Sequence, residues 1–141
     1  MRRGFTLLEL IIVIIILAIL ASLALPRFIS TTERARAAEA LANLAALRGA
    51  MDRYWVQNDR SYVGASMTNA ADCGAAAYNL DLDCPNTNVN KLFDYRLGAL
   101  AANTYSIIAT RLAVRGGTAG DSITIDDAGK IVGTGAFTSI K

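Results

Sequence analysis

The feature that most constrains this chain is an apolar run near its N-terminus. From Phe5 to Leu25 the sequence has 21 residues, of which only Glu9 is charged, and Pro26 follows them. As an α-helix rising about 1.5 Å per residue, this run is roughly 31 Å long, which matches the hydrocarbon core of a bilayer. Arg2 and Arg3 precede it without a compensating acid. This charge excess predicts a single membrane span with a cytoplasmic N-terminus, so that the rest of the chain is exported.

Glu9 has no partner of opposite charge inside this run. A carboxylate at the centre of a membrane helix costs about 2.5–3.5 kcal/mol, and there is no Lys, Arg or His from Gly4 to Pro26. A cut between Gly4 and Phe5 would create an amine four residues before Glu9. That amine could neutralise the Glu9 carboxylate of a neighbouring subunit packed with an axial offset.

The sequence Gly4-Phe5-Thr6-Leu7-Leu8-Glu9, the unbroken apolar helix and Pro26 together resemble the class III signal of type IV pilins and type II secretion pseudopilins. The resemblance implies that a prepilin peptidase cleaves after Gly4 and N-methylates Phe5. It also implies that Phe5, Glu9 and Pro26 take part in filament assembly. Its motifs cover the first 26 residues, and the rest of the chain supports it only by architecture.

Two points about this segment stay open. Ala18 and Ala46 stand where many pilins carry a helix-loosening Gly and a second helix Pro, so melting of the helix near Pro26 does not follow from the resemblance. An ordinary signal peptide is the alternative, because Ser22-Leu23-Ala24 offers a small-x-small cleavage site. A cleavable apolar region is usually only about 7–15 residues long, however, and has no need of Glu9.

A second, amphipathic helical stretch follows Pro26 and ends near residues 57–59. Its apolar residues recur at steps of three and four, the pattern of a helix with one buried stripe. They are Ala37, Leu41, Leu44, Leu47, Met51, Tyr54 and Trp55. Pro26 lacks an N–H donor and is predicted to kink or loosen the helix where the two halves join. Arg27, Arg34 and Arg36 have two possible roles. They could face solvent or lipid headgroups, or they could pair with acidic residues of neighbouring subunits.

The connection after this helix, residues 59–90, has no sustained period and contains the two cysteines, Cys73 and Cys84. Two thiolates alone make a poor metal site, and the exported location favours oxidation. We therefore predict a Cys73–Cys84 disulfide, which would contribute on the order of 2–3 kcal/mol by closing a short loop. This connection resembles the variable αβ-loop of pilins, which faces outward in the filament.

Residues 91–141 carry the strand patterns. Alternating, β-branched and aromatic residues predict strands at 92–97, 104–110, 122–125 and 131–132. Gly129, between the last two, predicts a hairpin turn with a positive φ, while residues 133–141 show no strong pattern. The predicted fold class is α+β, the type IV pilin fold, with a long N-terminal helix packed on a three- to four-stranded antiparallel sheet.

The predicted organisation has four parts. Residues 1–4 form a leader peptide, 5–25 a transmembrane or filament-core helix, 26–58 the amphipathic half of the long helix, and 59–141 a globular head. A head of this size needs the amphipathic half of the helix to complete its core.

The composition argues against catalysis and against a resident cofactor or metal. The chain has no histidine, which removes the commonest general base and zinc ligand, and nothing assembles a nucleophile, a base and an oxyanion site. Asp121, Asp126 and Asp127 could ligate calcium, as in some pseudopilins. Their spacing fits no EF-hand loop, and a solvated hairpin explains all three.

The charge balance argues against a nucleic-acid partner. Loss of Arg2 and Arg3 with the leader leaves 12 basic and 12 acidic side chains, a net charge of zero. Proteins that bind DNA usually carry an excess of positive charge. A local patch of Arg96, Arg111 and Arg115 is the one arrangement that this balance leaves open.

The resemblance implies a structural subunit of a type IV pilus, which polymerises through its N-terminal helix into an extracellular filament for adhesion, motility or surface attachment. Before assembly it would sit in the inner membrane as a single-pass protein. Its partners would be copies of itself in a helical filament, a prepilin peptidase and the pilus or secretion assembly machinery. A type II secretion pseudopilin and a minor or competence pilin that binds DNA are the alternatives.

We expect the mature chain to lack residues 1–4 and to carry a methyl group on the Phe5 amine. A bulky residue in place of Gly4 should block cleavage, because the peptidase must bring the main chain close to its site. Mass spectrometry of the intact protein and of its N-terminal peptide measures both outcomes. A mature chain that begins after Ala24 would contradict the pilin interpretation.

Overall fold

The computed structural model describes residues 5–67, 73 and 78–140, and for residues 26, 27, 29 and 30 only the main chain is described. The chain divides into two compact units, Met1–Thr32 and Glu33–Lys141. Gly4, the residue before the predicted cleavage site, lies outside the described residues.

A single α-helix, α1, runs from Leu7 to Gln57 and contributes to both units. Its main chain stays α-helical through Pro26, so the missing N–H donor does not interrupt the helix. A kink at Pro26 stays a prediction. In the first unit every residue from Phe5 to Leu25 is exposed.

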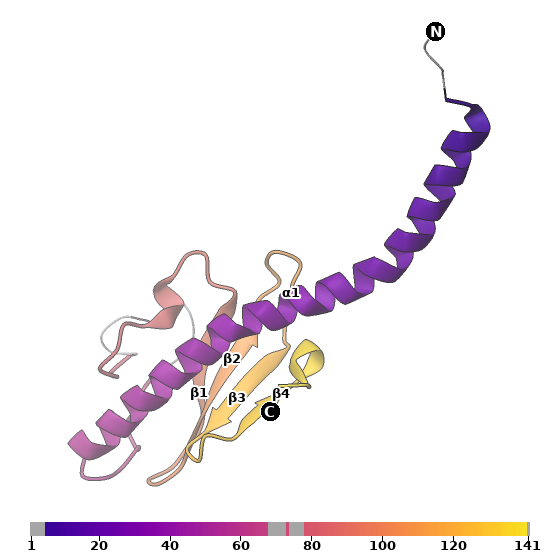
Figure 1. The fold of residues 1–141 in the computed structure, drawn as a ribbon. Coiled ribbons are helices and arrows are strands. Elements are labelled where there is room, and N and C mark those ends of the chain that lie inside the picture. Colours follow the sequence, from indigo (N-terminus) through magenta and orange to yellow (C-terminus); the bar gives the residue numbers. More distant parts are fainter. Residues whose placement is uncertain (1–4, 68–72, 74–77, 141) are drawn as a thin grey trace. The chain divides into compact units, whose positions relative to one another are not determined.

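The second unit contains a four-stranded antiparallel sheet of order β1-β2-β3-β4. Its strands are β1 (Phe93–Leu100), β2 (Tyr105–Arg111), β3 (Ser122–Asp126) and β4 (Ile131–Gly133). The C-terminal half of α1 lies across one face of this sheet (Figure 1). The predicted α+β class is therefore confirmed. Gly129 has a φ of +82°, as the predicted hairpin turn requires.

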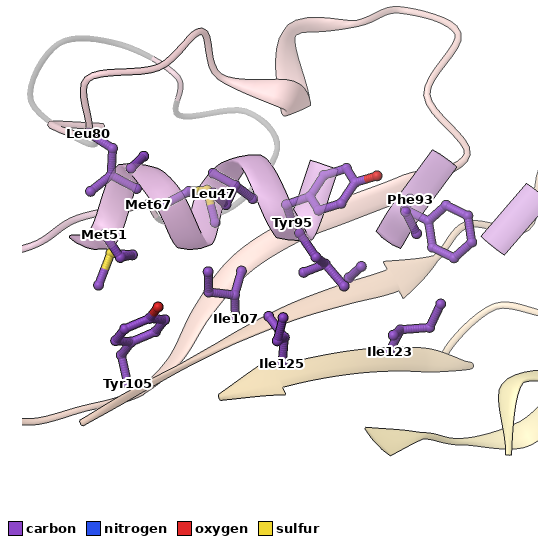
Figure 2. Close-up of a cluster of buried hydrophobic side chains, with 14 of the residues drawn as sticks. Leu47, Met51, Met67, Leu80, Phe93, Tyr95, Tyr105, Ile107, Ile123 and Ile125 are labelled. Carbon is purple, nitrogen blue, oxygen red and sulfur yellow. The ribbon is translucent and has the colours of Figure 1, made fainter. Parts of the chain in front are cut away.

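The core lies between this half of α1 and the sheet (Figure 2). Burial alternates along β2 because successive side chains of a strand point to opposite faces. Seven hydrophobic residues of the strands are buried: Phe93, Tyr95, Tyr105, Ile107, Ala109, Ile123 and Ile125. On α1, Leu44, Leu47 and Met51 of the predicted stripe are fully buried. Ala40 and Ala50 are also fully buried and were missed, because alanine alone gives a weak periodic signal.

The last residues contribute to the core although they showed no pattern. A short 3-10 helix at Gly135–Phe137 places the fully buried Phe137 ring 5.6 Å from the Phe93 ring, centroid to centroid. The Asp121 carboxylate accepts a hydrogen bond from Ala136 N at 3.0 Å and so fixes this segment beside β3. A single aromatic residue among small residues has no periodicity that could reveal its burial.

A buried ion pair joins the first residue of the second unit to the sheet. Arg111 is 1% exposed and Glu33 6% exposed, and Arg111 Nε donates to Glu33 Oε2 at 2.9 Å. The same guanidinium donates to the main-chain oxygens of Leu92 and Val114 at 3.0 and 3.1 Å. A Cβ at Gly117 would collide with this guanidinium, so that position requires glycine.

The possible surface patch of Arg96, Arg111 and Arg115 is therefore wrong. Arg96 and Arg115 are exposed, but Arg111 is buried and its charge is compensated by Glu33. The Arg111 guanidinium is buried and bonded to the Glu33 carboxylate and to main-chain carbonyl oxygens, so it cannot also contact the phosphates of DNA.

Replacing Glu33 with Gln should lower the free energy of unfolding of the head by about 3 kcal/mol at pH 7. One-sided loss of a buried ion pair costs about 3–5 kcal/mol, and Gln keeps an acceptor for Arg111. Urea unfolding of the full-length chain in detergent micelles, followed by Trp55 fluorescence, measures the change. Asp94→Asn, which breaks the more exposed Lys91–Asp94 pair, is the control and should cost under about 1 kcal/mol.

The same pair sets a pH dependence. Hydrogen bonds from Arg111 hold the pKa of Glu33 below its usual 4.5, although burial opposes this shift. The stabilisation is therefore fully present above about pH 4.5 and is lost as the pH falls through the lowered pKa. Glu33→Gln should flatten the stability curve below about pH 5, and equal slopes for the two proteins would contradict this assignment.

Candidate assembly site on the N-terminal helix

The first unit presents an apolar surface with nothing packed on it. Leu7–Leu25 spans 19 residues with a mean hydropathy of 3.1, and none of it is buried. This length and composition suffice to cross a membrane, since 19 helical residues extend about 28 Å. Monomeric soluble proteins rarely expose so much contiguous apolar surface. The segment therefore needs either lipid or other apolar helices around it.

The helix begins with a capping box made by Thr6 and Glu9. Thr6 N and Thr6 Oγ1 both lie 2.9 Å from Glu9 Oε2 and donate to it, and Glu9 N donates to Thr6 Oγ1 at 3.2 Å. These reciprocal bonds satisfy main-chain donors that the first helical turn cannot satisfy. Sequence reasoning missed this role, although Thr6-Leu7-Leu8-Glu9 has the Ser/Thr-x-x-Glu spacing that signals it.

The capping box leaves the charge of Glu9 uncompensated. Its donors are a hydroxyl and an amide, and both bonds go to Oε2. Within the described residues, Glu9 Oε1 has no hydrogen-bond donor and the carboxylate has no cation. The carboxylate can therefore accept a bond from an amine at Oε1 without losing the cap.

The other predicted assembly residues lie at the ends of this segment. Phe5 is exposed and directly precedes the capping box. Pro26 lies within α1 just after the apolar span, and only its main chain is described. The structure contains one subunit, so pairing of the Phe5 amine with a neighbour's Glu9 stays a prediction.

The αβ-loop between α1 and the sheet is fastened at several points. Cys73 and Cys84 form a disulfide with a Cα–Cα distance of 6.0 Å. Asn79 donates from Nδ2 to Gly64 O at 2.8 Å and accepts from Ser66 N at 2.7 Å. The disulfide and these hydrogen bonds therefore join parts of the αβ-loop to each other.

The three aspartates considered for calcium have local structural roles. Asp126 Oδ1 accepts from Lys130 N at 2.8 Å across the β3–β4 turn, and Asp121 binds Ala136 N. Asp127 contributes its main-chain oxygen, which accepts from Arg48 Nη2 at 3.2 Å. No group of three or more metal-ligating side chains occurs among the residues that the structure describes.

Comparisons with known proteins agree with this geometry. The family described as prokaryotic N-terminal methylation motif matches residues 1–25. The type II secretion system core protein G of Klebsiella pneumoniae is 46% identical over 59 residues, which cover 42% of this chain and 42% of that protein. The type IV major pilin protein PilA of Myxococcus xanthus is 47% identical over 58 residues, covering 41% and 26%. The chain thus matches less than half the length of these relatives.

The fold has a solved counterpart. The crystal structure of the Neisseria meningitidis non-core minor pilin PilV superposes with a TM-score of 0.54 and 19% identity, over 75% of this chain and 90% of that one. In its first 25 residues, in these partial matches and in its fold, the chain is similar to the type IV pilin and pseudopilin family. Subunits of this family are structural rather than enzymatic. The prepilin motif and the apolar helix are those of proteins anchored in a membrane before they enter a filament.

The capping box can be tested separately from the charge. Thr6→Ala should destabilise the first helical turn by about 1 kcal/mol, whereas Thr6→Ser keeps the hydroxyl and should change little. Hydrogen exchange of the Leu7–Leu10 amides in detergent micelles measures this fraying. Equal exchange rates in the two variants would show that Thr6 does not cap α1.

Proposed function

We propose that this chain is the structural subunit of a type IV pilus, which leaves the inner membrane and polymerises through residues 5–25 into an extracellular filament. The observation that carries the proposal is the wholly exposed apolar helix Leu7–Leu25 that begins with a charged, capped Glu9. A monomeric anchor would not need the charge, because an uncharged Gln can serve in the same capping box. A filament subunit uses it to fix the register of its neighbours.

The proposed process begins with cleavage after Gly4 by a prepilin peptidase and methylation of Phe5. The mature chain would then consist of the filament-core helix 5–25, the amphipathic half 26–58 and the head 59–141. Assembly would transfer the apolar helix from lipid into a bundle of like helices. Both environments are apolar, so shape packing and polar pairing would drive the transfer rather than the hydrophobic effect.

Polar pairing is the part that Glu9 would supply. In lipid its charge is costly, and in a bundle the Phe5 amine of an adjacent subunit would compensate it. Glu9 Oε1 is open to such an amine while Oε2 stays in the capping box. Pro26 would mark the junction between the bundled helix and the heads.

The head is compatible with a surface filament. Its long αβ-loop is closed by the Cys73–Cys84 disulfide, a bond that persists in exported proteins, including those at a cell surface. We propose adhesion, motility or surface attachment as its use. The neutral mature chain and the burial of Arg111 favour this role over DNA capture by a minor or competence pilin.

A type II secretion pseudopilin is the second candidate. It is favoured by the similarity to core protein G of Klebsiella pneumoniae, which covers a larger share of that relative than the match to the Myxococcus pilin does. Its shorter filament would push exported proteins through a secretion channel. Both candidates share processing, membrane origin and helix-mediated polymerisation, and they differ in where the filament ends.

Electron microscopy of filaments sheared from the cell surface, labelled with an antibody to the head, distinguishes the two candidates. A major pilin should label along the whole filament, and its deletion should remove the filaments while protein secretion continues. A pseudopilin should leave surface filaments unlabelled, and its deletion should retain exported enzymes inside the cell.

Glu9→Gln should block assembly while leaving the monomer intact. Gln can keep the capping box but carries no charge, so the amine of the neighbour would be buried uncompensated, at a cost of several kcal/mol or about a hundredfold in subunit addition. The paired measurement is the amount of protein in the membrane fraction and the yield of sheared filaments. Glu9→Leu, which also loses the cap, should insert in the membrane at least as well as wild type. Normal filament yield from Glu9→Gln would exclude charge pairing as the function of Glu9.

A further inference from the structure

The two edges of the sheet differ in how they are protected. At β1, Asn86 donates from Nδ2 to Tyr95 O at 2.7 Å and accepts from Tyr95 N at 2.8 Å. Leu97 N donates to Met67 O at 3.2 Å. The αβ-loop therefore occupies the outward-facing main-chain groups of Tyr95 and the N–H of Leu97. This closes the β1 edge to a further strand.

The β4 edge is short and open. Val132 pairs with Thr124 of β3, and the flanking bonds Asp126 N to Lys130 O and Thr134 N to Ser122 O fix the alternation of the ladder. The main chain of Ile131 therefore faces away from β3. Within the described residues, no hydrogen bond reaches it there.

An apolar groove of about 420 Å³ runs along this edge. It is lined by β4, by Gly129 and Lys130 before it, and by Thr138 and Ile140 of the C-terminal segment. The Val132 side chain is 50% exposed. The groove thus offers an apolar floor with one cationic side chain beside it.

An exposed apolar side chain, Val89, lies in the αβ-loop shortly before β1, the strand at the other edge of the sheet. We call this side chain, which is 97% exposed, the apolar projection, and its apolar surface is complementary to the apolar groove. Asn88 Oδ1 accepts from Asn90 N at 2.9 Å, and Lys91 N donates to Asn88 O at 3.2 Å. Single exposed valines are common, but this one is held at the corner of a fixed turn. Docking would therefore cost little conformational entropy.

The charged side chains beside the Val89 projection and beside the β4 groove have opposite signs. Asp83 is exposed and lines one pocket together with Asn88, the chain neighbour of Val89, and with Lys91, whose ammonium is paired with Asp94 at 2.8 Å. Lys130 lines the groove and is exposed. Within the described residues neither has an ion-pair partner. An unpaired carboxylate next to the projection and an unpaired ammonium next to the groove give complementary surfaces.

We propose that Val89 of one subunit docks into the β4 groove of a second copy, with Asp83 facing Lys130. The proposal deepens the proposed function and rests on it, because it requires a filament. Val89 precedes β1 and the groove is lined by β4, and these strands are the two edges of the sheet (Figure 1). The two surfaces differ, so the contact is heterologous. Heterologous contacts that do not close into a ring generate helical filaments, and each internal subunit would make the contact twice.

A photo-crosslinking amino acid at position 89, in full-length protein assembled into filaments, tests the contact directly. Irradiation should link position 89 to residues 129–133 or 138–140 of another subunit, as identified by mass spectrometry of the linked peptides. The same amino acid at position 63, where Val63 is 62% exposed in the same loop, should not give this link. Absence of the link from position 89, or a link to another protein or to another part of the subunit, would overturn the proposal.

Substitutions test how much the contact between Val89 and the β4 groove contributes to filament stability. Val89→Asp should lower the yield of sheared filaments about tenfold, since it removes apolar burial at two contacts per subunit, and the matched control Val63→Asp should not. Asp83→Lys and Lys130→Asp should each lower the yield, and the double variant should restore it. If wild type forms no filaments, the proposed function fails. If wild type forms filaments but Val89→Asp matches Val63→Asp, only the docking contact fails.

Discussion

The structure depends on one helix that must satisfy two different surroundings. Up to Leu25, α1 is apolar on every side and exposed, a pattern that only lipid or other apolar helices can accommodate. From Ala37 onward only one stripe is apolar, and the sheet covers it. The head completes its core with this stripe, so head folding does not use the surface needed for polymerisation. Folding and assembly can therefore occur at different times and places.

The sequence predicted those parts of the fold that repeat. Apolar residues recur every three or four positions in the helix and every second position in the strands, so the sequence predicts both. Gly129 predicts its turn because glycine readily adopts a positive φ. Features that depend on a single long-range contact leave no such pattern. Phe137 is buried in the core without belonging to a periodic pattern of apolar residues. No local sequence pattern distinguishes the buried Arg111 from the exposed Arg115. Only the pairing of Arg111 with Glu33, 78 residues away, distinguishes the two arginines.

The same distinction holds within the candidate site. The apolar span, the charge of Glu9 and the position of Pro26 follow from the residues alone, because length and polarity decide them. The capping box follows from the spacing of Thr6 and Glu9, whereas the cost of a charge in the membrane carries no information about a local cap. Groups that lie on another subunit cannot be predicted from one chain, whether by its sequence or by its fold.

The observed cap and the proposed intersubunit pairing of Glu9 are compatible because a carboxylate has two oxygens. Had the cap used both, a neighbour's amine would have to displace Thr6, and each assembly step would first break two hydrogen bonds. Both bonds from Thr6 instead reach Oε2, so an amine can approach Oε1 while the first turn of α1 stays capped. The cap also limits the rotamers of Glu9 before any neighbour arrives, which reduces the entropy lost on pairing. In the proposed filament, the monomer would thus already hold its charged group in place for the amine of a neighbour.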